Sequence, residues 1–194
     1  MADLFFDIIR RCKRGDRKAQ ESVYNLLVSK MFAICLRYCS NYEDARDLLH
    51  DGFVTVFTKI GQFQHGGSFE GWVRRIFVNH AMERYRNDAK LLMVDGIDEN
   101  SHHFAAYEDE EVDEWGAYRL TESELLAMVD DLPPQYKVVF NSYVIDGLSH
   151  RDIAEKLQIS ESASRSNLVR ARGILQRKVN DKVDSMPVVN NASK

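Results

Sequence analysis

Apolar side chains recur every three or four positions through most of this chain, which is the spacing of one face of an α-helix. The segment from Ala45 to Ile60 keeps that spacing for about four turns. Strand signals are nearly absent, because the three prolines fall at 133, 134 and 187 and no Asn-Gly or Asp-Gly turn joins two alternating runs. The pattern therefore predicts an all-α fold.

Four helical segments precede residue 90, and each begins or ends at a local signal. The first ends before Gly15, Asp16 is the expected N-cap of the second, and Asn41 with Asp44 resembles a capping box at the start of the third. The fourth runs from Phe69 past Tyr85. Four helices of this length predict one compact bundle, which we assign to residues 1–90.

Charge is distributed unevenly along the chain. Residues 1–90 carry 15 Lys and Arg against 11 Asp and Glu, residues 91–118 carry none against nine, and residues 119–194 carry 11 against ten. The formal net charge of −4 therefore comes from one acidic segment, and it does not exclude nucleic-acid binding by the flanking parts. We expect residues 91–118 to be an extended linker, because like charges repel one another.

A second helical domain is expected at residues 119–183, followed by a disordered tail at 184–194. Its helices break at Pro133-Pro134 and again at Gly147. Ser149 with Asp152 opens a short helix, residues 158–160 form a tight turn, and Ser160 caps a long basic helix that extends to about Val179. This order is the plan of a helix-turn-helix.

The long basic helix separates into an apolar face and an outward face. Ser164, Leu168, Ala171 and Leu175 share the inner face at steps of four, three and four residues. An outward basic face at the start of such a helix suits the major groove of DNA, where Arg reads guanine. The alternative is an amphipathic helix whose polar face is only solvated. The outward residues are Arg165, Ser166, Asn167, Val169, Arg170 and Arg172.

Two further patterns lie in the first domain. Glu43, Asp47 and Asp51 form an acidic row at steps of four residues, which indicates either a cationic partner or a solvated face. A loop of small residues from Phe63 to Ser68 precedes a helix with arginines off its apolar stripe, and such a site can admit an unpaired base. Alternatively, the aromatics Trp72 and Phe77 are core residues. The polar residues of this helix are Arg74, Arg75, Asn79 and Arg86.

No catalytic motif, phosphate-binding loop or metal-ligand spacing is found, so the sequence predicts neither an enzyme nor a cofactor or metal. Cys12, Cys35 and Cys39 lack the number and spacing of a disulfide framework. His102-His103 is attributed to linker composition. No run of 18 apolar residues indicates a membrane span, and the sequence predicts a cytoplasmic protein.

The segments described above resemble the sigma-70 family of bacterial initiation factors, in particular its small two-domain group, the extracytoplasmic-function (ECF) sigma factors. YEDARDLLHDGFVTVF is similar to region 2.2 of that family, and SFEGWVRRIFVNHAMERYR is similar to regions 2.3 and 2.4. LPPQYKVVF followed by GLSHRDIAEKLQISESASRSNLVRAR is similar to region 4. The resemblance covers roughly residues 5–90 and 120–180, with the motifs in the family's order.

The resemblance implies a role for three sets of residues. Asp47, His50 and Asp51 correspond to contacts with the clamp of the polymerase largest subunit, with His50 where Gln is usual. Asn79 and the loop residues Phe63, Gln64, His65, Gly66, Gly67 and Ser68 correspond to the capture of flipped bases of the −10 element. Arg165, Ser166, Val169 and Arg170 correspond to readers of the −35 element, with Asn167 replacing a common basic residue.

The sequence thus predicts a promoter-specificity subunit that binds core RNA polymerase and promoter DNA, both duplex and single-stranded. An anti-sigma factor is a further candidate partner. The acidic linker is expected either to mimic nucleic acid in the basic channels of the polymerase or to cover the basic faces of its own chain. One alternative is a helix-turn-helix regulator whose N-terminal bundle senses a ligand or dimerises. Another is an interaction adaptor with an incidental basic helix.

Overall fold

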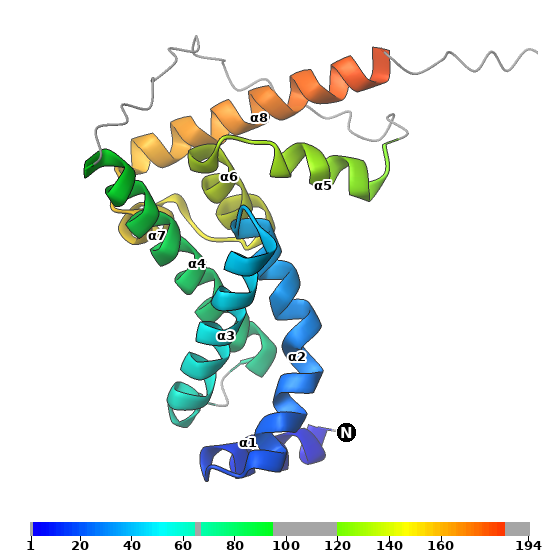
Figure 1. Cartoon of the computed structure of the whole chain (residues 1–194), viewed down its shortest axis with the longest axis vertical. Helices are drawn as coiled ribbons and strands as arrows, with labels where there is room; N and C mark the ends of the chain where they lie inside the picture. Colours follow the sequence, from blue (N-terminus) through cyan, green and yellow to red (C-terminus); the bar gives the residue numbers. More distant parts are fainter. Residues whose placement is uncertain (1, 65–66, 95–119, 185–194) are drawn as a thin grey trace, which may run out of the picture. The chain divides into compact units, whose positions relative to one another are not determined.

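The computed structural model describes residues 2–64, 67–94 and 120–184, and within these ranges it consists of helices and turns without a strand. The all-α prediction is confirmed. The described part divides into two compact units, one with α1–α4 and the other with α5, α6, most of α7, and α8. Figure 1 shows the helices α1 (Ala2–Lys13), α2 (Arg17–Tyr38), α3 (Tyr42–Lys59), α4 (Phe69–Val94), α5 (Glu122–Asp130), α6 (Pro134–Phe140), α7 (His150–Leu157) and α8 (Glu161–Asp184). The short helix η1 (Ile60–Gln62) follows α3, and the π-helical η3 (Asn141–Ile145) follows α6.

The amino-terminal unit is a bundle in which α2 packs against α1, α3 and α4. Its core contains Leu27 and Met31 from α2, Val56 from α3, and Phe77 and Met82 from α4, each at most 1% exposed. Helix α3 approaches α4 closely at Gly52, where a Cβ atom would lie 2.3 Å from the Phe77 ring. Burial of these aliphatic and aromatic side chains holds the four helices together.

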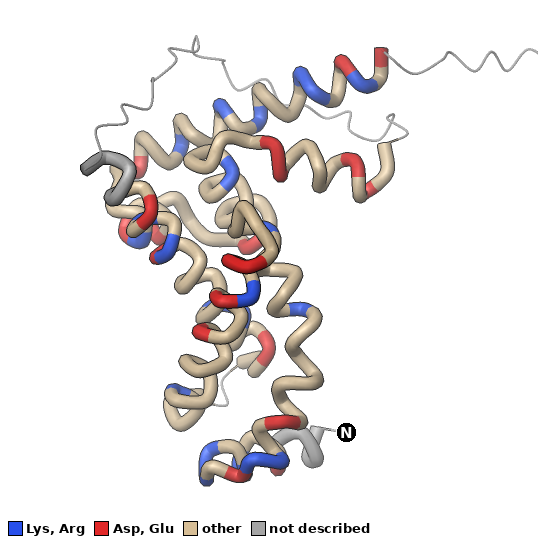
Figure 2. Tube along the Cα trace, viewed as in Figure 1, with Lys and Arg blue, Asp and Glu red and all other residues tan. Residues whose placement is uncertain are grey.

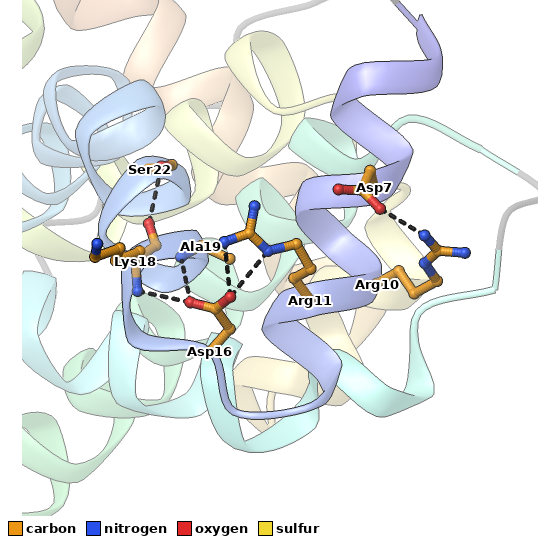
Figure 3. A network of polar contacts seen from close by, with 7 residues as sticks. All are labelled: Asp7, Arg10, Arg11, Asp16, Lys18, Ala19 and Ser22. Atoms are coloured by element: carbon orange, nitrogen blue, oxygen red, sulfur yellow. Dashed lines mark hydrogen bonds and ion pairs between the residues drawn. The ribbon is translucent and has the colours of Figure 1, made fainter.

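Asp16 joins α1 to α2 at a tight corner (Figure 3). Its carboxylate accepts the backbone N–H groups of Lys18 at 2.9 Å and Ala19 at 3.2 Å, as expected for an N-cap. The same carboxylate pairs with Arg11 at 2.8 Å, and these contacts hold the pKa of Asp16 below its ordinary value. The sequence-predicted cap at Asp16 is therefore confirmed.

The carboxy-terminal unit packs α8 across α6 and α5. Helix α5 begins at a full capping box between Thr121 and Glu124, and α6 begins with Pro134 in its first turn. The core contains Leu132 and Tyr136 together with Ala171 and Leu175 of α8. Met128, Val129, Phe140 and Ile174 pack around these four residues.

Two helices are longer than the sequence predicted. Helix α4 reaches Val94, four residues past the expected domain end at 90, because no Gly or Pro interrupts the segment before Gly96. Helix α8 reaches Asp184 instead of about Val179, and again no Gly or Pro follows Gly173 before Pro187. The rest of the predicted linker, with His102 and His103, and the tail after 184 lie outside the described residues.

Candidate nucleic-acid interface

Helices α7 and α8 form the predicted helix-turn-helix. The Asp152 N–H donates to Ser149 Oγ at 3.1 Å and the Ser149 N–H donates to Asp152 Oδ2 at 3.3 Å, which completes the capping box. Ser160 Oγ accepts the N–H of Ala163 at 3.0 Å. Between the helices Gln158 has φ +58, the left-handed conformation that reverses the chain in a short turn.

His150 connects the two helices in a way that the sequence analysis did not predict. Its Nδ1 lies 2.9 Å from Ser164 Oγ, and its ring stacks on Tyr143 with centroids 4.3 Å apart. Burial lowers the pKa of His150, and the positive charge of Arg165 lowers it further. The His150 side chain therefore fixes the start of α7 against α8, the helix with the outward basic face.

The division of α8 into two faces is confirmed. Ser164, Leu168, Ala171 and Leu175 are buried as predicted, and Val179 joins them. Of the outward residues, Arg165, Ser166 and Arg172 are exposed, whereas Asn167, Val169 and Arg170 are half-buried. Arg165 forms an exposed ion pair with Glu161 at 3.1 Å, a contact of a kind that contributes little to stability.

The acidic row of α3 is exposed. Glu43, Asp47 and Asp51 lie on the surface with His50, and within the described ranges none of the three carboxylates forms an ion pair. Asp44 differs from them, because it pairs with Arg84 of α4. Figure 2 shows acidic segments along α3. The row thus presents negative charge that the amino-terminal unit itself does not neutralise.

The predicted base-capturing loop, residues 63–68, is only partly open to solvent. Gln64, Gly67 and Ser68 are exposed, and His65 and Gly66 lie outside the described residues. Phe63 is 5% exposed and packs against Phe69 and Trp72, with ring centroids 5.1 and 5.6 Å away. The Phe63 side chain therefore packs in the core beneath the loop surface, and it is not available to stack on a base.

The polar residues of α4 follow the loop on one helix. Arg75 is exposed, whereas Arg74, Asn79 and Arg86 are half-buried. Asn79 Oδ1 is buried and has no hydrogen-bond partner among the described residues. Phe77 is fully buried, so the interpretation of this residue as core is correct, and Trp72 is half-buried.

Within the described ranges no group of three or more His, Cys, Asp or Glu side chains could hold a metal ion. No helix of this part of the chain is long and apolar enough to cross a membrane. Cys12, Cys35 and Cys39 form no disulfide among the described residues, and burial raises the pKa of Cys35 to about 12.

Comparison with known proteins identifies both units. Residues 23–91 match the family model for sigma-70 region 2, and residues 122–175 match the model for sigma-70 region 4. The first match lies in the amino-terminal bundle and ends within α4. The second runs from the start of α5 into the middle of α8.

Two curated relatives illustrate the similarity. ECF RNA polymerase sigma factor SigE of Mycolicibacterium smegmatis is 28% identical over 161 residues, which are 81% of this chain and 62% of that protein. ECF RNA polymerase sigma factor SigW of Bacillus subtilis is 25% identical over 89% of this chain and 95% of its own length. Among solved structures, the sigma factor RpoE from Bartonella quintana, in complex with the anti-sigma factor NepR, aligns over 82% of this chain and 96% of that chain, with 19% identity and a TM-score of 0.48.

Proposed function

The chain belongs to the ECF group of the sigma-70 family of RNA polymerase sigma factors, which direct transcription initiation, and from this premise we propose how its two units divide promoter recognition. The observation that carries the proposal is the order of the two family matches, each within one compact unit with its own exposed charged face. The proposed domains are residues 1–90 and 119–183, joined by the acidic segment 91–118, whose first four residues continue α4.

The amino-terminal unit binds core polymerase and the −10 element. The exposed, unpaired carboxylates of Asp47 and Asp51, with His50 between them, suit a cationic surface of the polymerase clamp. The exposed Gln64, Gly67 and Ser68, followed on α4 by the half-buried Asn79, suit the capture of unpaired bases. Arg74, Arg75 and Arg86 add positive charge for the strand.

The carboxy-terminal unit reads the −35 element through the exposed start of α8. Arg165 and Ser166 face solvent one turn after the N-terminus of that helix, and Val169 and Arg170 follow one turn later. Arg can contact guanine through two hydrogen bonds, and a Val side chain can contact the thymine methyl group. Asn167, within this set, and Arg172, just after it, contribute contacts to the DNA backbone.

The sigma-70 family is not a class of enzymes, and we propose that this chain likewise acts without a catalytic residue, cofactor or metal. We further propose that it works in the cytoplasm, where it forms a complex with core polymerase.

Run-off transcription from genomic fragments tests the proposal. Core polymerase with this chain is expected to start at discrete promoters, whereas core polymerase alone does not. The proposal fails if the chain leaves start sites unchanged and instead binds a palindrome as a symmetric dimer, as a helix-turn-helix regulator would.

A further inference from the structure

The corner between α1 and α2 contains a concentration of positive charge. Residues 7–18 hold six Lys and Arg against two Asp, whereas the other residues of 1–90 hold nine basic and nine acidic side chains. The entire net charge of +4 in residues 1–90 therefore comes from these twelve residues. We call Arg10, Arg11, Lys13, Arg14, Arg17 and Lys18 the basic corner, and Figure 2 shows basic segments there, in α1 and at the start of α2.

Two of the six cations are neutralised locally. Asp7 pairs with Arg10 at 2.6 Å and Asp16 pairs with Arg11 at 2.8 Å (Figure 3). The other four side chains are exposed, and among the described residues no carboxylate pairs with Arg14, Arg17 or Lys18. Four positive charges thus face solvent on one short stretch of chain.

Local stability explains only part of this arrangement, because Lys13 lies in the last turn of α1, where a cation interacts favourably with the helix dipole, whereas the start of α2 offers no such gain. Arg17 and Lys18 lie in the first turn of α2, which contains no acidic residue. A cation at a helix N-terminus opposes the helix dipole. Like charges at close spacing also repel one another, so an anion beside Arg14, Arg17 and Lys18 would be favourable.

The basic corner adjoins the 63–68 loop. Lys13 Nζ donates a hydrogen bond of 2.9 Å to the carbonyl oxygen of Phe63 and lies 6.0 Å from the centroid of that ring. Helix α1 also contacts η1, the short helix that leads into the loop. A strand whose bases enter the loop would therefore pass the basic corner.

We propose that the basic corner binds backbone phosphates of the promoter strand whose unpaired bases the 63–68 loop captures. Arg14, Arg17 and Lys18 supply the contacts, and Lys13 fixes the corner to the loop. This inference rests on the proposed function and adds to it a contact with no base specificity. Because each cation releases a condensed counterion from the strand, binding must depend on salt.

The test uses complexes of core polymerase with the full chain on a promoter fragment whose −10 region is unpaired. The variant Arg14→Gln with Arg17→Gln removes two of the unpaired charges. The matched control, Lys178→Gln with Lys182→Gln, removes two charges of α8, one half-buried and one exposed, that pair with Asp131 and Glu124. Between about 50 and 200 mM salt, wild type should lose about sevenfold more affinity than the variant, because single-strand binding loses about 0.7 in slope per contact.

A second template identifies the phosphates. When methylphosphonates replace the phosphates beside the −10 bases, wild type and variant should bind equally, and the control should bind as wild type does on both templates. An unchanged salt slope in the variant overturns the inference. So does a loss of polymerase binding in the absence of DNA, which would make the basic corner a polymerase contact. If wild type itself forms no promoter complex, the proposed function fails as well.

Discussion

Single residues determine how closely neighbouring helices within each unit can approach one another. Gly52 allows α3 to reach the Phe77 ring, and His150 joins α7 to α8 through Ser164. Both contacts join segments distant in sequence, so their removal should change the packing of a whole unit.

Gly52→Ala should destabilise the amino-terminal unit by about 1–3 kcal/mol, because its Cβ would overlap the fully buried Phe77 ring. Gly71→Ala is the control, since its Cβ would meet Ser68 at an ordinary 3.6 Å and should leave stability unchanged or raise it. Urea unfolding followed by Trp72 fluorescence, in a background with Trp115→Phe, measures both. Equal stability of the two variants would contradict the close packing at Gly52.

His150 should make the carboxy-terminal unit sensitive to acid. The unfolded chain binds a proton at the ordinary histidine pKa, whereas burial lowers the pKa of His150 in the folded state. The contribution of unprotonated His150 to the stability of the folded unit is therefore complete above about pH 6.5, and it is lost as the pH falls below that value. Urea unfolding followed by amide signals of α8 should show a steeper loss of stability for wild type than for His150→Gln. Parallel pH profiles would show that His150 does not couple protonation to folding.

Local signals were predicted from the sequence, and contacts between distant segments were not. Asp16, Ser149 and Ser160 were correctly predicted as caps, because a cap depends on residues within one turn of it. The burial of Phe63, in the loop after η1, depends on Trp72 of α4. The hydrogen bond between His150 and Ser164 depends on the angle between α7 and α8. No spacing in the sequence encodes either contact.

At the scale of elements, α3 and α8 each separate a packing face from an exposed charged face. Helix α3 buries Leu48, Phe53 and Val56 and exposes Asp47 and Asp51. Helix α8 buries Leu168 and exposes Arg165. A substitution on either outer face should therefore change binding without unfolding the unit.

Asp51→Arg should weaken the complex with core polymerase by at least about tenfold, because it places a cation against the cationic surface that we propose as its partner. Glu21→Arg, an exposed reversal on α2, is the matched control and should bind normally. Sedimentation of the complex without DNA measures both, with circular dichroism as the check on folding. Normal polymerase binding by Asp51→Arg would show that α3 does not contact the clamp.

Arg165→Ala should relax base preference at one position of the −35 element by about 1–3 kcal/mol of discrimination. Arg177→Ala, farther along the exposed side of α8, is the control and should keep the wild-type preference. Competition among promoter fragments with single substitutions measures the change. An unaltered preference in Arg165→Ala would place the base contact elsewhere on α8.

At the scale of the whole molecule, opposite charges are separated along the sequence. The nine acidic residues of 91–118 lie between two domains that carry net positive charges of +4 and +1 in residues 1–90 and 119–183. Such a separation allows the linker to compete with DNA for the basic faces of the same chain.

Neutralising Glu108, Asp109, Glu110, Glu111, Asp113 and Glu114 should raise the DNA affinity of the protein without polymerase, with a smaller effect at high salt. Asp181→Asn with Asp184→Asn, which removes acidic charge from the end of α8, is the control. Fluorescence anisotropy with a labelled promoter duplex measures the affinities. Unchanged affinity in the linker variant would exclude self-masking.

The lengthwise division of α8 has an evolutionary consequence. The side chains that maintain the fold and those that we propose to meet DNA alternate along one helix, so exposed members of the second set can be exchanged while the first is kept. After gene duplication, a few surface substitutions would be enough to assign a daughter protein to a different group of genes, with little cost to the stability of either copy.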